Sequence, residues 1–143
     1  MKRVIISFLL TAFNTAVVLQ VPGEFETIQM GLDSAGTGDT VLVASGTYHE
    51  SITIRQDVVL TSHIMFNDEW NAQEETIISG MSVTEYVCTI TNDSLITVQL
   101  VGFTFECGNS ITGGIFGDFV ELTVMDVTLQ SFTGNGISLD NSD

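Results

Sequence analysis

The pattern of hydrophobic and polar positions changes its period once along this chain, close to Thr40. Between Val21 and Thr40, apolar residues recur at spacings of three and four, which is the period of one helix face. After Thr40, short runs rich in β-branched and aromatic residues alternate with Gly, Asn, Asp and Ser, a pattern typical of strands joined by turns. The sequence therefore predicts one short helix followed by strands alone.

The predicted helix covers about residues 25–35. Its apolar face comprises Phe25, Ile28, Leu32 and Ala35. Thr27 or Glu26 is suited to begin the helix. Gly36 or Gly38 is suited to end it, because glycine readily adopts the left-handed conformation common after a helix. We expect this helix to cap the first open edge of the strands, with its apolar face over the end of the core.

Ten short strands are predicted after the helix. They cover residues 41–44, 51–54, 58–62, 76–79, 86–91, 96–100, 102–106, 119–124, 127–130 and 136–139. The connections between them leave no room for crossover helices, so the strands must pair through turns. This spacing excludes a doubly wound α/β fold and leaves two all-β folds, a parallel solenoid and an antiparallel sandwich.

A weak internal repeat favours the solenoid. The triplet Phe103-Thr104-Phe105 recurs as Val127-Thr128-Leu129, and the pair Gly114-Ile115 recurs at a similar interval as Gly136-Ile137. The interval fits the length of one coil, in which equivalent residues of successive turns stack on one another. Short strands at this spacing also occur in a sandwich, so the repeat alone does not exclude that fold.

Several motifs occur in the order found in one family. They are Thr27-Ile28-Gln29, Gly38-Asp39-Thr40-Val41, Gly46-Thr47-Tyr48 with Glu50, Thr76-Ile77-Ile78-Ser79-Gly80, Gly102-Phe103-Thr104-Phe105 and the turn Gly113-Gly114-Ile115. With these motifs the chain resembles the secreted right-handed parallel β-helix repeat proteins of the pectate-lyase-like superfamily. The resemblance implies an all-β fold, a right-handed parallel β-helix with a short N-terminal capping helix and about four to five coils.

Asp39, Tyr48 and Glu50, which belong to the second and third of these motifs, are expected to stabilise the fold rather than to bind a ligand. Asp39 precedes a strand and is expected to accept backbone N–H bonds in a turn. Tyr48 and Glu50 are expected to pack and cap the first turn. The chain departs from the family pattern at Cys107-Gly108, where Asn-Gly is common, so the resemblance does not extend to an asparagine ladder at that corner.

The amino terminus has the pattern of a secretory signal peptide. Lys2 and Arg3 precede a mainly apolar stretch over residues 4–19, which is shorter than the roughly 20 residues of a membrane-spanning helix. Residues 1–20 are therefore predicted to be a signal peptide and residues 21–143 the β-helix domain. Cleavage after Ala16 and cleavage after Gln20 both remain open. The predicted location is outside the cell or on its surface, with no membrane attachment after cleavage.

Acidic residues dominate the charge. The 143-residue chain carries a net charge of −15, and without Lys2 and Arg3 its 18 acidic residues face Arg55 alone, which gives −17. Such a surface repels nucleic acids and anionic lipids, so neither is an expected partner. Polysaccharide or other surface components are the expected partners. No cofactor is predicted, and calcium is the one cation that the acidic residues suggest.

The longest irregular stretch, residues 64–75, is one candidate binding region. It holds Asp68, Glu69 and Trp70, and a tryptophan beside acidic residues suits sugar stacking or calcium binding. The alternative is a loop that packs its aromatic residues against the sheet.

The acidic residues of the later coils are the second candidate. They are Glu106, Asp118, Glu121 and Asp126. Outward carboxylates on successive coils could line a groove and carry out acid and base chemistry on glycosides, whereas the commoner role of such residues is a solvated acidic face. Lyase chemistry of the pectate-lyase type also needs a basic residue, and Arg55 lies far from these coils in sequence.

The two cysteines and two histidines have simpler explanations. The sequence separation of Cys88 and Cys107 is close to one coil, so they could form a disulfide or pack as buried free thiols. They do not form a convincing zinc site without suitably spaced histidines. His49 and His63 lie in turn regions and are expected at the surface.

No catalytic set is predicted within this chain. The expected function is therefore a non-catalytic, exported β-helix module for surface adhesion or carbohydrate contact. The alternative is the N-terminal part of a carbohydrate-active lyase, hydrolase or esterase. Residues 136–143 begin a new coil without a terminal cap, so the sequence also predicts an incomplete C-terminal end.

Overall fold

The structure is a computed structural model that describes residues 15–63, 75–81, 85–107 and 113–140. These residues form one helix and eleven strands, and every strand pair among them is parallel. The predicted all-β class is confirmed. The antiparallel sandwich is excluded, because its neighbouring strands would run in opposite directions.

The elements follow one another along the chain with short connections. They are β1 (Val18–Val21), α1 (Ile28–Ser34), β2 (Asp39–Val43), β3 (Gly46–Tyr48), β4 (Ile52–Ile54), β5 (Val58–Ser62), β6 (Thr76–Ser79), β7 (Tyr86–Val101), β8 (Thr104–Glu106), β9 (Gly113–Met125), β10 (Thr128–Gln130) and β11 (Ile137–Asp140).

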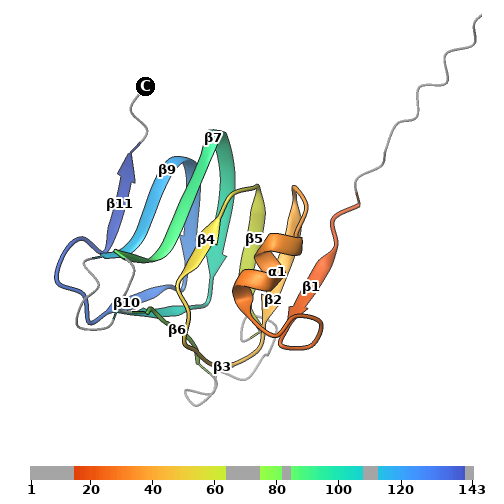
Figure 1. Cartoon of the computed structure of the whole chain (residues 1–143), viewed down its shortest axis with the longest axis horizontal. Coiled ribbons are helices and arrows are strands. Elements are labelled where there is room, and N and C mark those ends of the chain that lie inside the picture. The colour runs from red at the N-terminus through yellow and green to blue at the C-terminus, as the bar shows by residue number, and fades with distance from the viewer. Residues whose placement is uncertain (1–14, 64–74, 82–84, 108–112, 141–143) are drawn as a thin grey trace, which may run out of the picture.

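The strands form two parallel sheets (Figure 1). The seven-stranded sheet has the order β1-β2-β5-β7-β9-β11, with β4 beside β7, and the four-stranded sheet has the order β10-β8-β6-β3. The long strands β7 and β9 each take part in two rows of paired strands. Their first halves pair with each other and lie between β4 and β11. Their second halves pair with each other and extend the row of β1, β2 and β5.

The pairing therefore defines three ladders of stacked strands. The upper ladder is β1-β2-β5 with the second halves of β7 and β9, and the base ladder is β3-β6-β8-β10. The side ladder is β4, the first halves of β7 and β9, and β11. From β2 onward the chain visits the upper, base and side ladders in that order and then repeats the circuit.

The core lies between the ladders and is built from residues in the same register. On the upper ladder, Val41, Leu60 and Leu100 are partners on successive strands and are fully buried. On the base ladder, Ile78 and Phe105 are partners and equally buried. Like residues stack on like because neighbouring parallel strands lie about 4.8 Å apart with their side chains on the same face.

The helix α1 begins where the sequence predicts but ends differently. Thr27 is its N-cap and accepts a hydrogen bond from Met30 N at 3.1 Å. The helix lies against β1, β2 and β4 (Figure 1), and its residues Ile28 and Leu32 are buried. The predicted left-handed glycine cap is wrong, because the helix ends at Ala35 in an extended conformation with its N–H bonded to two helix carbonyls.

The strand β1 changes two expectations for the amino-terminal end. The sequence predicts that the helix covers the first edge of the sheet, but β1 pairs with β2 and forms that edge itself. Leu19 and Val21 are buried in the core. The expected domain boundary between Gln20 and Val21 thus falls inside a strand.

The structural roles predicted for Asp39 and Tyr48 are confirmed, whereas Glu50 caps the helix rather than the first turn. The Asp39 carboxylate accepts hydrogen bonds from Gly36 N at 2.7 Å and Val17 N at 2.8 Å. The Tyr48 hydroxyl donates to Ala44 O at 3.1 Å. Burial, and the nearby carboxylate of Glu50, raise the pKa of Tyr48.

Glu50 caps the helix from a distance in the sequence. Its two carboxylate oxygens accept hydrogen bonds from Ile28 N at 2.9 Å and Gln29 N at 3.0 Å. The Gln29 side chain in turn accepts from Thr53 N at 2.7 Å and donates to Thr53 O at 3.1 Å. This arrangement gives hydrogen-bond partners to two N–H groups at the start of α1 and to the backbone N–H and carbonyl of Thr53 in β4.

Candidate functional site

The four acidic residues predicted on the coils do not share one ladder. Glu106 lies on the base ladder between its partners Ser79 and Gln130. Asp118 lies on the side ladder, and Glu121 on the upper ladder beside Thr97. These carboxylates belong to different faces.

Asp126 lies apart from those three. It follows β9 at a corner, with a left-handed φ of 51°. The structure therefore does not bring the four carboxylates together in one groove.

The other predicted polar residues offer no metal site within the described residues. No group of three or more His, Cys, Asp or Glu side chains suited to hold a metal occurs there. Asp68, Glu69 and Trp70 lie outside the described residues. His49 and His63 are exposed, as predicted.

Both cysteines are free thiols, so the expected disulfide alternative is not the one that the structure adopts. Cys88 and Cys107 are buried, and the Cys107 thiol donates to Gly113 O at 3.5 Å. Burial raises the pKa of Cys88 to about 12. Burial, together with the charge of Glu106, also raises the pKa of Cys107. A thiol that stays protonated is a poor nucleophile and a poor metal ligand.

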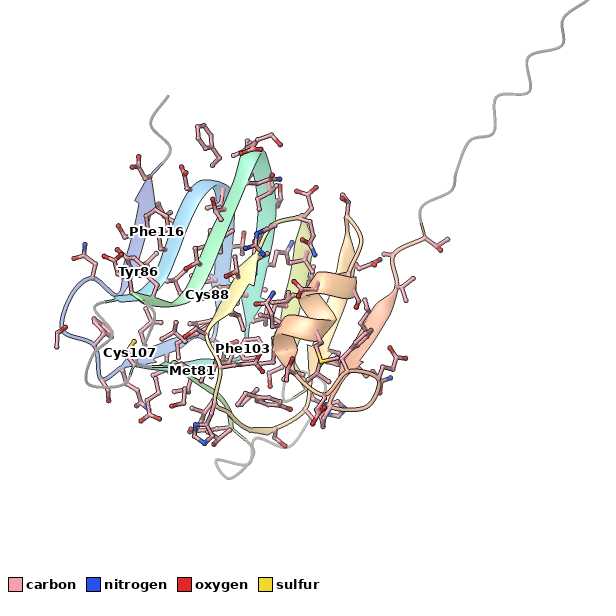
Figure 2. The ribbon with its side chains drawn as sticks, viewed as in Figure 1. Met81, Tyr86, Cys88, Phe103, Cys107 and Phe116 are labelled. Carbon is pink, nitrogen blue, oxygen red and sulfur yellow. The ribbon has the colours of Figure 1, made fainter. Side chains whose placement is uncertain are left out.

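An aromatic pair on the side ladder is the best-defined feature of the outer surface. The ring centroids of Tyr86 and Phe116 are 5.2 Å apart, with the ring planes tilted by 34°. Both residues are half-buried, and Figure 2 shows them next to each other beside β9 and β11. Their spacing lies within the range of favourable aromatic contacts.

The contact with Phe116 places the Tyr86 ring beside the outward side chains of the side ladder. The next two residues, Val87 and Cys88, are buried, whereas Tyr86 is only half-buried. Its ring lies over its ladder partner Gly113, where an added Cβ atom would clash with Tyr86 Cε1. Gly113 is thus required for close approach of the ring to the sheet.

Polar side chains continue the same surface along the ladder. Phe116 lies between its partners Thr89 and Ser138, and Asp118 lies between Thr91 and Asp140. We call these residues, together with Tyr86, the side-ladder face. Because parallel partners project to the same side of a sheet, the face presents hydroxyls and carboxylates beside two aromatic rings.

The side-ladder face combines groups that contact sugars well. Aromatic rings offer apolar surface to the C–H faces of a pyranose, and hydroxyls and carboxylates exchange hydrogen bonds with its hydroxyl groups. Arg55 is exposed and follows β4 rather than lying on this face. The side-ladder face therefore suits the binding of a sugar better than proton transfer to or from one.

The sequence pattern indicates Asp118 but neither Tyr86 nor Phe116. The glycines of residues 113–118 favour a turn, whereas the structure places these residues in β9. The signal that could have placed Phe116 on a strand is the repeat of Gly114-Ile115 as Gly136-Ile137, because the two isoleucines are partners on β9 and β11.

Comparison of the chain with protein-family models, curated proteins and solved structures finds no match. Among the residues that the structure describes, no helix is long and apolar enough to cross a membrane.

Proposed function

We propose that this chain is an exported, non-catalytic β-helix module that contacts carbohydrate, or another component of the cell surface, through its side-ladder face. The fold part of this proposal rests on the three ladders and on the repeated order in which the chain visits them. That order is the one expected of a right-handed parallel β-helix of the pectate-lyase-like type, with α1 as its capping helix. Export rests on the apolar, signal-like amino terminus.

The observation that carries the function is the contact of Tyr86 with Phe116 on a regular outer surface. A lone aromatic residue is common on a protein surface, but here a second ring supports it and a glycine makes room for it. Thr89 and Ser138 flank Phe116 at the spacing of neighbouring strands. A ligand with polar edges and an apolar face fits this combination of side chains.

The charge of the protein narrows the ligand class. The net charge of −15 disfavours an acidic polysaccharide, because ligand and protein would repel each other. Neutral glycans avoid that repulsion. We therefore propose a neutral polysaccharide as the preferred partner.

The second candidate is the N-terminal part of a carbohydrate-active lyase, hydrolase or esterase. It is favoured by one observation, the direct pairing of Asp118 with Asp140 across β9 and β11. Two carboxylates on neighbouring strands are a suitable start for acid and base chemistry or for calcium binding, completed by residues elsewhere.

Binding of neutral oligosaccharides to the full chain tests the first candidate. We expect the Phe116→Ala variant to bind about tenfold more weakly, which corresponds to about 1.4 kcal/mol of lost contact. Thr89→Ala should weaken binding less, and Thr104→Ala, a matched change on the base ladder, should leave it unchanged. Equal binding by the Phe116→Ala and unsubstituted proteins would contradict the proposed face.

Depolymerisation of polysaccharides with and without calcium tests the second candidate. Asp118→Asn and Asp140→Asn should abolish any activity if these carboxylates take part in it. Calcium-dependent activity lost in both variants would replace the binding module by the enzyme. Activity that both variants retain would place the chemistry elsewhere.

A further inference from the structure

Val17, the residue just before β1, is fixed to the sheet by two hydrogen bonds. Val17 N donates to Asp39 Oδ1 at 2.8 Å, and Val17 O accepts from Thr40 N at 2.9 Å. The second oxygen of Asp39 accepts from Gly36 N at 2.7 Å, which fixes the carboxylate in place. The two hydrogen bonds to the carboxylate hold the pKa of Asp39 below its usual value, although burial acts against them.

Cleavage after Gln20, one of the two predicted sites, conflicts with the packing of β1. It would remove Leu19, which is 7% exposed, and expose the edge of β2. It would also place a charged α-ammonium group on Val21, a core residue whose carbonyl accepts a hydrogen bond from Ala44 N, and would remove three of the four β1 residues that pair with β2.

Cleavage after Ala16 preserves the whole strand. Thr15, Ala16 and Val17 are exposed and lie outside any strand, so a protease can reach them. Ala16 also has the small side chain that leader-cleaving proteases require directly before the cut, although Asn14, two positions earlier, is not the small residue typical of such sites. A cut one residue later would remove both the N–H that Asp39 accepts and the carbonyl that Thr40 binds.

We propose that Ala16–Val17 is the processing site of the exported chain, and that the new α-ammonium group of Val17 pairs with the carboxylate of Asp39. The inference rests on the export that the proposed function includes. It makes Asp39 a receptor for the mature amino terminus, in addition to its role in the turn before β2.

The chemistry needs only water and a leader-cleaving protease. Water adds across the Ala16–Val17 peptide bond, which leaves a carboxylate on Ala16 and an amine on Val17. The amine takes up a proton near neutral pH, since the usual pKa of an α-amino group is about 7.7–8.0. The nitrogen already lies 2.8 Å from Asp39 Oδ1, so a neutral hydrogen bond becomes a charge-assisted one without rearrangement of β2.

The first test identifies the amino terminus of the exported protein. The full chain is produced in a host with an export pathway, and the protein outside the cell is analysed by intact mass and N-terminal sequencing. We expect Val17 as the first residue. The Ala16→Leu variant should lose this product, whereas Gln20→Leu, a matched change at the other predicted site, should keep it.

The second test uses the lysine content of the chain. Lys2 is the single lysine in the sequence, so a protein that begins at Val17 carries one amine, its own α-amino group. Acetylation should therefore add one acetyl group and lower the Tm, because it removes the charge that Asp39 binds. In the Asp39→Asn protein the same acetylation should leave the Tm unchanged.

The outcomes separate this inference from the proposed function. A protein that stays inside the cell with residues 1–16 attached would contradict both. An exported protein that begins at Val21 would overturn the processing site while leaving export intact. An exported protein that begins at Val17, but whose Tm falls on acetylation as much in the Asp39→Asn variant as in the unsubstituted protein, would overturn the pairing alone.

Discussion

The two ends of the upper ladder contain similar residues in very different surroundings. Leu19, Val41, Leu60, Leu100 and Val124 are partners on five successive strands. The first four are at most 7% exposed, whereas Val124 is 40% exposed. The exposed fraction of an aliphatic side chain in this register therefore depends on what packs over it, rather than on its own position on the strand.

The helix accounts for much of the difference between the ends. At the amino-terminal end, Ile28 and Leu32 of α1 pack against β1, β2 and β4. At the other end, Ile137 and Leu139 on β11 are 40% and 50% exposed. Each strand of a ladder stabilises the strands on either side of it. Residues on the middle strands therefore contribute most to the free energy of unfolding.

The largest expected effect comes from truncating matched leucines at two depths of the stack. Leu100→Ala should lower the free energy of unfolding by about 3 kcal/mol, because it leaves a cavity in a fully buried register. Leu139→Ala should cost less than about 1 kcal/mol, because half of that side chain is already in water. Urea unfolding followed by circular dichroism measures both, and equal costs would contradict the comparison.

A smaller effect is expected from the cap of α1. Glu50→Gln keeps one acceptor oxygen and loses the second, so it should cost about 1 kcal/mol of unfolding free energy. The matched change Glu121→Gln, at an exposed position of β9, should cost less than about 0.5 kcal/mol. The same urea titration applies. A cost at Glu121 that equals the cost at Glu50 would show that the helix cap does not stabilise the amino-terminal end.

The smallest expected effect is a pH dependence at Asp39. Hydrogen bonds from Val17 and Gly36 lower its pKa from the ordinary 3.8, so the folded state favours the charged carboxylate. The resulting stability is present above pH 3.8 and is lost as the pH falls through the lower pKa of the folded protein. Asp39→Asn should therefore flatten the fall of Tm below pH 3.8.

Asp118→Asn is the control for that experiment, because it removes one negative charge from the opposite end of the stack. Its curve corrects for the general effect of net charge on Tm. If the Asp39→Asn and Asp118→Asn curves fell together on acidification, the hydrogen bonds of Asp39 would not contribute to the pH dependence.

The sequence predicts the middle of the fold well because its pattern is clear there. Both β5 and β6 begin and end at the predicted residues, where apolar runs are bounded by polar or glycine positions. The strand β1 is not predicted, because Val18 and Leu19 continue the apolar stretch that resembles a signal peptide. A local pattern does not distinguish an apolar leader from a buried edge strand, since only pairing with β2 separates them.

The candidate site is harder to predict because it depends on contacts between distant residues. Nothing near Gly113 in the sequence indicates that the Tyr86 ring occupies the space above it. The acidic residues, which do stand out in the sequence, are distributed over different ladders. Composition reveals carboxylates, whereas the register decides which of them become neighbours.

Successive coils differ in length, yet their strands keep the same register within a ladder. This affects how such a protein can evolve or be redesigned. Thr47, Ile77, Thr104 and Thr128 are successive partners on the base ladder, although the sequence separation shortens from each pair to the next. The last shortening occurs at the corner inside β7, where the register with β9 shifts between Thr91 and Ile96 as the strand passes from the side ladder to the upper ladder. Segments can therefore be grafted into a corner, by mutation or by design, without shifting the strands, so that new recognition loops can be added to an unchanged frame.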